Sequence, residues 1–318
     1  MKKSFKISIF MFLLAGASLT AENSFNPTEM IVIPKTEYII GEDCQTYTAK
    51  RTVNEFSIAR YETVYSLWYS VMEKAKKLGY KFQNPGQEGS EGKYASSPTE
   101  QNSSQPVTMI SWYDAIVWCN AYSETSGLTP CYTYKGKVIK DSTNTAPCDL
   151  SECNFFADGY RLPTEAEWEL AARWHPAKNP GEDNVIASGG EVSYGEERED
   201  GLSGYYWTSE NTDRTHKVGT SGTAFEEIAF VAPGSGLCNA AGIFDMTGNV
   251  LEYCWDWYSN YDEQEEGKIS SGPAYGSKRI SRGGSWSEYT LFEYTGDRYS
   301  FDPNECYNYM GFRVVQSR

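Results

Sequence analysis

Histidine is scarce in this sequence, and the cysteines do not form metal-binding pairs. The 318 residues include only two histidines, His175 and His216, which lie far apart and form no H-x-x-x-H motif. None of the eight cysteines belongs to a CxxC pair. These absences argue against a histidine-rich metal site, a zinc ribbon and a thioredoxin-type redox site, because each of these needs such a spacing.

Basic residues are also few relative to acidic ones. Lys and Arg number 28 against 43 Asp and Glu, so the formal net charge is −15. Such a chain repels a phosphate backbone, and we therefore expect no nucleic-acid partner. The acidic residues are spread along the sequence rather than gathered in one tail, which is typical of a solubilising surface.

The apolar run near the N-terminus is too short to span a bilayer. Lys2, Lys3 and Lys6 precede the run Ile7–Ala15, which is the pattern of a secretory signal. We therefore predict that residues 1–21 form a leader and that the protein is exported.

The end of this leader resembles a bacterial lipobox. In Leu14-Ala15-Gly16-Ala17, Ala17 stands where a lipobox has its lipidated cysteine. Two interpretations stay open: a plain signal peptide, or the leader of a lipoprotein whose native form has cysteine at position 17. In the second case a lipid anchor places the protein at the cell surface or outer membrane, and that anchor is its only membrane contact.

The cysteines of an exported protein can pair. Cys148 and Cys153 flank a short loop, so one or both are candidates for a disulfide, but the sequence does not determine which cysteines pair. The eight cysteines are Cys44, Cys119, Cys131, Cys148, Cys153, Cys238, Cys254 and Cys306.

Two predicted helices carry capping signals at their starts. Ser111 can cap one helix, with Asp114 in the first turn, and the apolar face of this helix includes Cys119. Thr164 and Glu167 have the spacing of a capping box. The full pattern predicts strands at 30–34 and 55–61 and short aromatic strands after 237. It predicts helices at 65–78, from 111 onward, and from 164 to about 174. The segments 83–105 and 178–236 are expected to be irregular.

The composition favours one large domain. Hydrophobic residues make up 40% of the chain, enough for a sizeable core, and no repeat or linker divides it. We therefore assign residues 22–318 to a single domain.

Four ordered motifs resemble the formylglycine-generating-enzyme (sulfatase-modifying factor) family. They are AIVWCNAYSETSGLTPCYT at 115–133, GYRLPTEAEWELAAR at 159–173, NAAGIFDMTGNVLEYCWDW at 239–257, and a tail that begins RGGSW and ends GFRV. The resemblance implies an α+β fold, the C-type lectin fold of this family. We expect a small twisted antiparallel sheet, two main helices and long irregular loops.

The resemblance does not extend to the catalytic residues of the family. Its enzymes resemble one another in a copper-binding cysteine pair after the Gly-Gly-Ser motif, and the matching positions here are Glu288 and Glu293. Cys306 is the only thiol left in the tail, and one thiol cannot supply a two-thiolate copper site. The related sulfoxide synthases use a histidine-rich iron site, which is missing too. We therefore predict a protein that is not an enzyme and has no catalytic cofactor.

The tail, residues 282–318, also resembles the variable region of proteins diversified by retroelements, which share the C-type lectin fold. We call residues 282–318 the variable region. In such proteins a fixed scaffold surrounds positions rich in Tyr, Asn, Ser, Asp and Thr. Antibody paratopes favour a similar set, because tyrosine offers a large rigid area with a polar tip. The predicted ligand-binding residues are Trp286, Ser287, Tyr289, Tyr294, Tyr299, Ser300, Asp302, Tyr307, Asn308 and Tyr309.

Other residues of the tail have simpler interpretations. Trp286, Phe301 and Phe312 are better candidates for scaffold than for contacts, although Trp286 can line the rim. Arg282, Arg298 and Arg313 are expected to make structural hydrogen bonds. Capping and packing explain Glu165, Glu167 and Glu169 better than paired catalytic carboxylates do.

The family resemblance implies a structural calcium site. Its ligands would be the side chains of Asp245 and Glu252 and the carbonyls of Gly248 and Val250, since calcium takes six to eight oxygen ligands. The alternative is a plain turn and strand, with Asn249 bonded to the local backbone.

These observations favour a non-catalytic, surface-displayed protein whose variable region forms a Tyr-rich binding site. We expect a macromolecular ligand, a protein in the first place and a glycan as the alternative. Two other functions stay open: a metal-dependent oxidase that acts on a protein cysteine, and a purely structural envelope protein.

Overall fold

Two four-stranded sheets lie at the centre of the computed structural model, which describes residues 25–41, 48–176, 206–223, 230–261, 272–288 and 295–318. The first sheet has the strand order β1 (Met30–Ile33), β4 (Phe56–Ala59), β15 (Val315–Ser317), β10 (Tyr160–Arg161), with every pair antiparallel. Since β15 pairs with β4, this sheet joins the two ends of the described chain.

The second sheet carries the variable region. Its order is β13 (Tyr299–Phe301), β12 (Arg279–Arg282), β11 (Leu251–Trp257), β14 (Met310–Gly311). Three of these strands pair antiparallel, but β14 runs parallel to β11. The expected antiparallel sheet therefore has one parallel edge, because the chain returns to β11 from the variable region in the same direction.

Shorter pairings surround these sheets. The first is the ribbon β2 (Thr36–Ile40) with β3 (Ala49–Val53), and the second is β5 (Gln87–Glu88) with β6 (Val107–Thr108). A three-stranded sheet has the order β8 (Lys137–Val138), β7 (Tyr132–Tyr134), β9 (Glu152–Cys153). The segment 83–105, predicted to be irregular, thus contributes the short strand β5.

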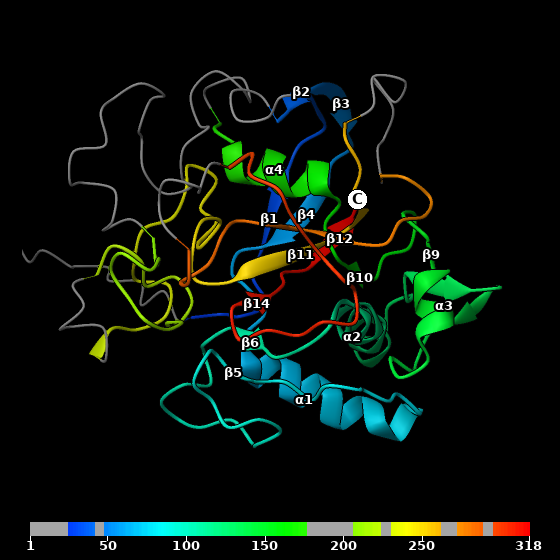
Figure 1. The fold of residues 1–318 in the computed structure, drawn as a ribbon, viewed down its shortest axis with the longest axis horizontal. Coiled ribbons are helices and arrows are strands. Elements are labelled where there is room, and N and C mark those ends of the chain that lie inside the picture. The colour runs from blue at the N-terminus through cyan, green and yellow to red at the C-terminus, as the bar shows by residue number, and fades with distance from the viewer. Residues whose placement is uncertain (1–24, 42–47, 177–205, 224–229, 262–271, 289–294) are drawn as a thin grey trace, which may run out of the picture.

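Helices cover both sides of the central strands. Figure 1 shows α1 (Tyr65–Ala75) and α2 (Trp112–Thr125) below β11 and β14, and α4 (Glu165–Arg173) above β11 and β12. A 3₁₀ turn, Lys76–Leu78, extends α1, and the short α3 (Thr145–Asp149) lies beside β9. The two longest of these helices, α1 and α2, are the two main helices that the family resemblance implies, so the predicted α+β class is confirmed.

Both predicted helix caps are present. The Ser111 hydroxyl accepts from the Asp114 N–H, and the Asp114 carboxylate accepts from the Ser111 N–H, which makes a capping box at the start of α2. Thr164 and Glu167 form the same reciprocal pair at the start of α4. The Glu167 carboxylate also receives two hydrogen bonds from Arg161, at 2.6 and 2.7 Å. Local capping chemistry therefore fixes where both helices begin.

Helix α2 is buried on nearly all sides, more than its one predicted apolar face suggests. Its polar residue Asn120 is fully buried and bonds to β7: its amide donates to the Tyr132 carbonyl and accepts from the Tyr132 N–H, at 2.8 and 2.9 Å. A buried amide costs little once its donors and acceptors are satisfied. Asn120 thus ties α2 to the sheet of β7, β8 and β9.

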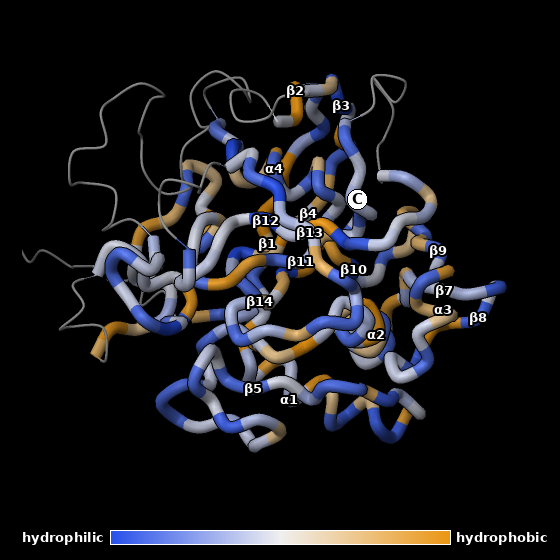
Figure 2. The backbone as a smooth tube through the Cα atoms, viewed as in Figure 1, coloured by the Kyte–Doolittle hydropathy of each residue, from blue (hydrophilic) through white to orange (hydrophobic). Residues whose placement is uncertain are grey.

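Aromatic rings link the helices to the end of the variable region. Trp68 of α1 stacks on Trp118 of α2, with ring centroids 5.6 Å apart, and Phe312 meets both rings edge-on. Figure 2 shows hydrophobic residues gathered around α2 and the central strands. Phe312 is fully buried, so its predicted scaffold role is confirmed.

The disulfide prediction is wrong for the described cysteines. Cys148 and Cys153 are both free thiols, as are the other described cysteines, while Cys44 lies outside the described residues. Cys148 is the buried residue of α3, which packs against α2, and Cys153 pairs through its backbone with Tyr132. The two cysteines are thus held by packing and strand pairing rather than by a bond to each other.

The predicted leader, residues 1–21, lies outside the described residues. In the part of the chain that the structure describes, no helix combines the length and the apolar character needed to cross a bilayer.

Candidate functional site

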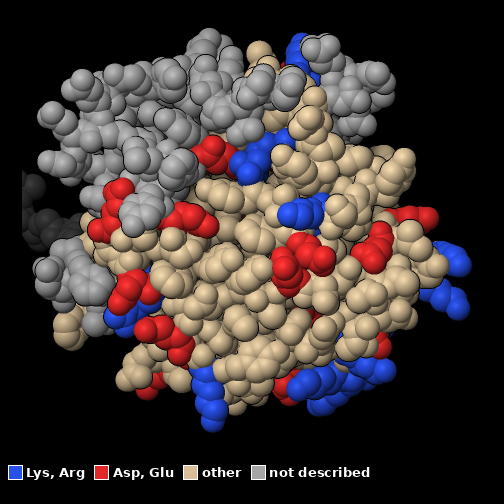
Figure 3. Space-filling view, in the orientation of Figure 1, with Lys and Arg blue, Asp and Glu red and all other residues tan. Residues whose placement is uncertain are grey.

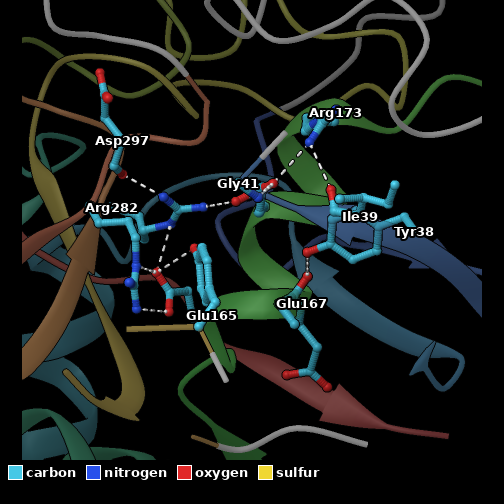
Figure 4. A network of polar contacts seen from close by, with 12 residues as sticks. Tyr38, Ile39, Gly41, Glu165, Glu167, Arg173, Arg282 and Asp297 are labelled. Atoms are coloured by element: carbon cyan, nitrogen blue, oxygen red, sulfur yellow. Dashed lines mark hydrogen bonds and ion pairs between the residues drawn. The ribbon is translucent and has the colours of Figure 1, made fainter. Parts of the chain in front are cut away.

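Two short segments hold the variable region in place, and we call them the frame: residues 282–286 and 311–313. Arg282 ends β12 and is fully buried. Its guanidinium donates to the Glu169 carboxylate on α4 and to the Asp297 carbonyl (Figure 4). The start of the variable region is therefore tied both to α4 and to a residue 15 positions further along the tail.

A second arginine of the tail reaches the same helix. Arg298 donates to both oxygens of Glu165, at 2.6 and 2.8 Å, and stacks over Tyr261 at 3.9 Å from the ring centroid. Glu169 also binds Arg173, at 2.9 Å, and the Gly41 N–H, at 2.8 Å. We call Glu165, Glu169, Arg173, Arg282 and Arg298 the α4 network. It anchors the chain on both sides of residues 289–294.

Arg313 closes the other end of the frame. It is fully buried and its guanidinium makes a two-pronged contact with Glu252 of β11, at 2.6 to 2.9 Å. The Trp168 ring N–H donates to the same carboxylate at 2.8 Å. The predictions that Arg282, Arg298 and Arg313 make structural hydrogen bonds are therefore confirmed.

Glycine is required where the frame passes over α4. Gly283 has φ +94°, a conformation that side chains disfavour. A Cβ added there would lie 3.0 Å from a ring carbon of Trp168. The Gly-Gly pair thus lets the backbone lie against the buried indole, and the Trp168–Glu252–Arg313 contact forms directly beneath it.

Three rings of the tail form a cluster, which we call the aromatic stack: Phe301, Tyr307 and Tyr309. The two tyrosine rings lie 4.9 Å apart and 13° from parallel, and Phe301 lies 5.6 Å from Tyr307. All three side chains are half-buried, with one side against the main core. Tyr307 and Tyr309 project together as predicted, but from a turn rather than from a continuous strand.

The other predicted contact residues surround this stack. Ser287 and Asp302 are exposed, and Trp286, Tyr299, Ser300 and Asn308 are half-buried. Trp286 donates to the Asn308 carbonyl at 3.4 Å, which links the frame to the aromatic stack. Tyr289 and Tyr294 lie outside the described residues.

Two segments outside the variable region support it, and no sequence pattern predicted either contact. The Ser209 N–H and hydroxyl both donate to the Glu288 carbonyl, at 3.0 and 2.9 Å. The Asn308 amide donates to the Ser90 carbonyl at 3.3 Å. Ser90 and Ser209 lie in segments predicted to be irregular, where no periodicity marks a contact.

The family resemblance matches Glu288 to one of the two cysteines of the enzymes. Its carboxylate accepts from the Ser285 hydroxyl at 2.7 Å, and burial raises its pKa. The second position, Glu293, lies outside the described residues. Burial also raises the pKa of Cys306, which lowers its thiolate fraction and therefore its ability to bind a soft metal.

The residues of the implied calcium site do not fit a cation in the observed arrangement. The oxygens of Glu252 are taken up by Arg313 and Trp168. Asp245 accepts from the Gly219 N–H through one oxygen, while its other oxygen is buried without a hydrogen bond. Among the described residues, no group of three or more His, Cys, Asp or Glu side chains is placed to hold a metal ion.

Asn249, in the same turn, does not bond locally as the alternative interpretation expects. Its amide donates to the Glu62 carboxylate at 2.7 Å and accepts from the His216 N–H at 2.9 Å. Asn249 itself has φ +60°, which asparagine tolerates better than most residues. Calcium binding at Asp245, Gly248, Val250 and Glu252, which the family resemblance implies, is untested, and the contacts of Glu252 argue against it.

The sequence and fold have known relatives. The family described as sulfatase-modifying factor enzyme 1-like domain matches residues 16–318. A protein named chaperone protein LppX from Paenibacillus barcinonensis is 30% identical over 98% of each chain. The formylglycine-generating enzyme of Bos taurus is 24% identical, over 91% of this chain and 75% of its own length.

A solved structure shows the same fold with a similar extent. Treponema denticola variable protein 1 superimposes with a TM-score of 0.69 at 28% identity, covering 91% of this chain and 95% of its own. The predicted resemblance to both the formylglycine-generating enzymes and the variable proteins is therefore confirmed, and with it the predicted type of fold.

The α4 network generates a stability prediction. Glu169→Gln keeps the shape of the side chain but removes the charge that faces Arg173 and Arg282. Removing one partner of a buried ion pair costs about 3–5 kcal/mol, and we expect that loss in urea unfolding. The control is Glu73→Gln on α1, which breaks an exposed pair with Lys76 and should cost at most about 1 kcal/mol. Equal losses in the two variants would contradict the role given to Glu169.

The fit of the calcium site generates a second prediction. Because Arg313 already neutralises Glu252, we expect neither calcium nor EDTA to shift the melting temperature of the purified protein. A ligand that binds only the folded state raises that temperature with concentration. A saturable rise with calcium, unmatched by magnesium and abolished in Asp245→Asn, would show instead that Glu252 releases Arg313 to bind the ion.

Proposed function

Because this chain belongs to the sulfatase-modifying factor enzyme 1-like domain family and shares its fold with a variable protein, we propose that it is a non-catalytic, surface-displayed binding protein. Its ligand contacts the variable region, residues 282–318. The observation that carries the proposal is the aromatic stack: two parallel tyrosine rings, half-exposed, on a frame whose buried charges are paired internally.

The chemistry of this surface suits recognition of a macromolecule. Tyrosine offers apolar area and a hydroxyl while losing little side-chain entropy on binding. Ser287 and Asp302 add exposed polar groups beside the rings. Figure 3 shows a face with a broad uncharged area in its middle and charges of both signs around it. A protein surface is the expected partner, and a glycan is the alternative.

The frame prepares this surface for binding. The α4 network and the Arg313–Glu252 pair hold the backbone on both sides of the aromatic stack. A loop that is already ordered loses less entropy when a ligand binds. Side chains on such a loop can differ without a change in the frame, which supports the further proposal that a retroelement diversifies them.

Two residues support the absence of catalysis. Glu288 replaces a family cysteine and is held by Ser285, and Cys306 is a single thiol whose pKa burial raises. The competing function is a metal-dependent oxidase that acts on a protein cysteine. An oxidase of that kind would bind copper or iron in a one-to-one ratio and convert a cysteine peptide. We expect metal analysis and peptide assays to show neither.

Display at the cell surface is part of the proposal, and it rests on the leader pattern and on the similarity to a variable protein. Lipid attachment requires a cysteine at position 17 in the native gene. The DNA beside that gene tests diversification: we expect a near-copy of its 3′ end that differs mainly at adenines, next to a reverse-transcriptase gene. If both are missing, the diversification proposal is wrong.

The binding surface itself is tested by substitution. We expect Tyr307→Ala and Tyr309→Ala to cost about 1 kcal/mol each, because each ring is half-exposed and loses mainly its stacking partner. Phe312→Ala, three residues after Tyr309 and fully buried, should cost about 3–5 kcal/mol. The measurement is urea unfolding of the three variants.

The same substitutions must change binding. A library that varies Ser287, Tyr299, Asp302, Tyr307 and Tyr309, displayed on yeast and sorted against a fluorescent model protein, should yield binders. A control library on the exposed face of α1 and the 3₁₀ turn that follows it, at Glu73, Lys74 and Lys77, should yield none. Tyrosine variants as unstable as Phe312→Ala, or equal yields from the two libraries, would show that the rings belong to the core.

A further inference from the structure

A pocket of about 200 Å³ lies away from the aromatic stack, where the β2–β3 ribbon meets the start of α4. The end of β11 and the residues that follow it close the other side. Among the residues lining it are Arg51, Glu165, Asp256, Trp257, Tyr261 and Arg298. We call it the Arg51 pocket. Sites for drug-sized ligands measure about 300–1,000 Å³, so this one suits a smaller molecule or a single side group.

Arg51 is a buried cation without an acidic partner among the described residues. Only 4% of its surface is exposed. One guanidinium nitrogen donates to the neighbouring Lys50 carbonyl at 3.2 Å, and no ion pair to Arg51 forms in the described part of the chain. An unpaired buried charge is costly, so such groups are normally paired or hydrogen-bonded. Arg51 instead lines the pocket, and its guanidinium has N–H donors beyond the one that bonds Lys50.

The acidic residues of the pocket do not supply that partner. Both oxygens of Glu165 are bonded by Arg298. Asp256 accepts from the Glu165 N–H at 2.7 Å, and burial raises the pKa of Asp256 to about 8. Near neutral pH its carboxyl group therefore keeps a proton and can donate a hydrogen bond. The uncompensated charge of the pocket is the positive charge of Arg51.

The rest of the lining combines apolar side chains with the polar residues Ser259 and Asn260. Ile40 and Trp257 contribute buried hydrophobic side chains, and Ala166 lies at the first turn of α4. A ligand that satisfies all of these groups combines one negative charge with a compact apolar body.

We propose that the Arg51 pocket binds a carboxylate carried on a small apolar group, with the carboxylate against the Arg51 guanidinium. Arginine and carboxylate match in shape, with two parallel N–H···O bonds. A phosphate fits worse, because its second negative charge would lie beside Glu165. This site is separate from the aromatic stack and does not depend on the function proposed for it.

Calorimetry with benzoate tests the proposal. We expect saturable binding of sodium benzoate to the full chain, with sodium chloride as the salt control. Benzamide has the same shape without the charge and should bind at least about tenfold more weakly, since hydrogen bonds to charged groups contribute about 1.5–3 kcal/mol. Phosphate should bind no better than chloride. Equal binding of benzoate and benzamide, tighter binding of phosphate, or no binding of benzoate would overturn the proposal.

Variants on one strand locate the site. Arg51→Gln should weaken benzoate binding at least about tenfold while the protein stays folded, because removing an unpaired buried charge does not destabilise. The control is Lys50→Gln, one residue away on β3, whose exposed side chain pairs with Glu37. It should bind benzoate like the original chain. Unchanged binding in Arg51→Gln would contradict the assignment.

The carboxylate can come from a free acid or from the end of another polypeptide, and peptides separate these sources. A short peptide ending in phenylalanine with a free carboxylate is compared with its C-terminal amide. If only the free-carboxylate peptide displaces benzoate, the pocket accepts a chain terminus. If neither displaces it while benzoate binds, the ligand is a free small acid. Displacement by both peptides would contradict recognition of the carboxylate.

Discussion

The fold depends on buried ion pairs between α4 and arginines of the tail. Glu165 and Glu169 lie on α4, whose start is fixed by the Thr164–Glu167 capping box, and they face Arg298 and Arg282 across more than a hundred residues of sequence. Breaking such a pair leaves a buried charge alone, which is why the arrangement tolerates little change. These pairs fix the position of the tail on α4. The positions of the residues between and after the two arginines depend on that attachment.

This constraint separates two kinds of residue in the variable region. The backbone at Gly283 and the guanidiniums of Arg282 and Arg313 are enclosed by other parts of the chain. The rings of Tyr307 and Tyr309 pack on the core with one side and on each other. A change in the first group alters the fold, whereas a change in the second alters mainly the surface. A protein with variable contacts needs this separation.

Sequence reasoning identified what local chemistry determines. Both helix caps, the strand at 30–34 and the structural roles of Arg282, Arg298 and Arg313 were predictable, the last three through family motifs. It failed where contacts join distant segments. Ser209 donates a hydrogen bond to the Glu288 carbonyl, 79 residues further along the chain, and no sequence periodicity predicts such a contact. Cys148 and Cys153 were disulfide candidates because they flank a short loop, yet both are free thiols and Cys153 pairs through its backbone with Tyr132. The tyrosines of 289–294 lie outside the described residues.

The chain is similar both to proteins named formylglycine-generating enzyme and to one named variable protein, and the frame requires only that the residues just after Gly-Gly-Ser fit beside it. In this chain Glu288 fits by accepting a hydrogen bond from Ser285, while its carbonyl is held by Ser209. A carboxyl group with a raised pKa is a poor ligand for a soft metal, but it completes a polar contact under the surface. Under the proposed function, Glu288 therefore keeps these polar contacts of the frame without a thiol, and the neighbouring side chains are available for contact with a partner.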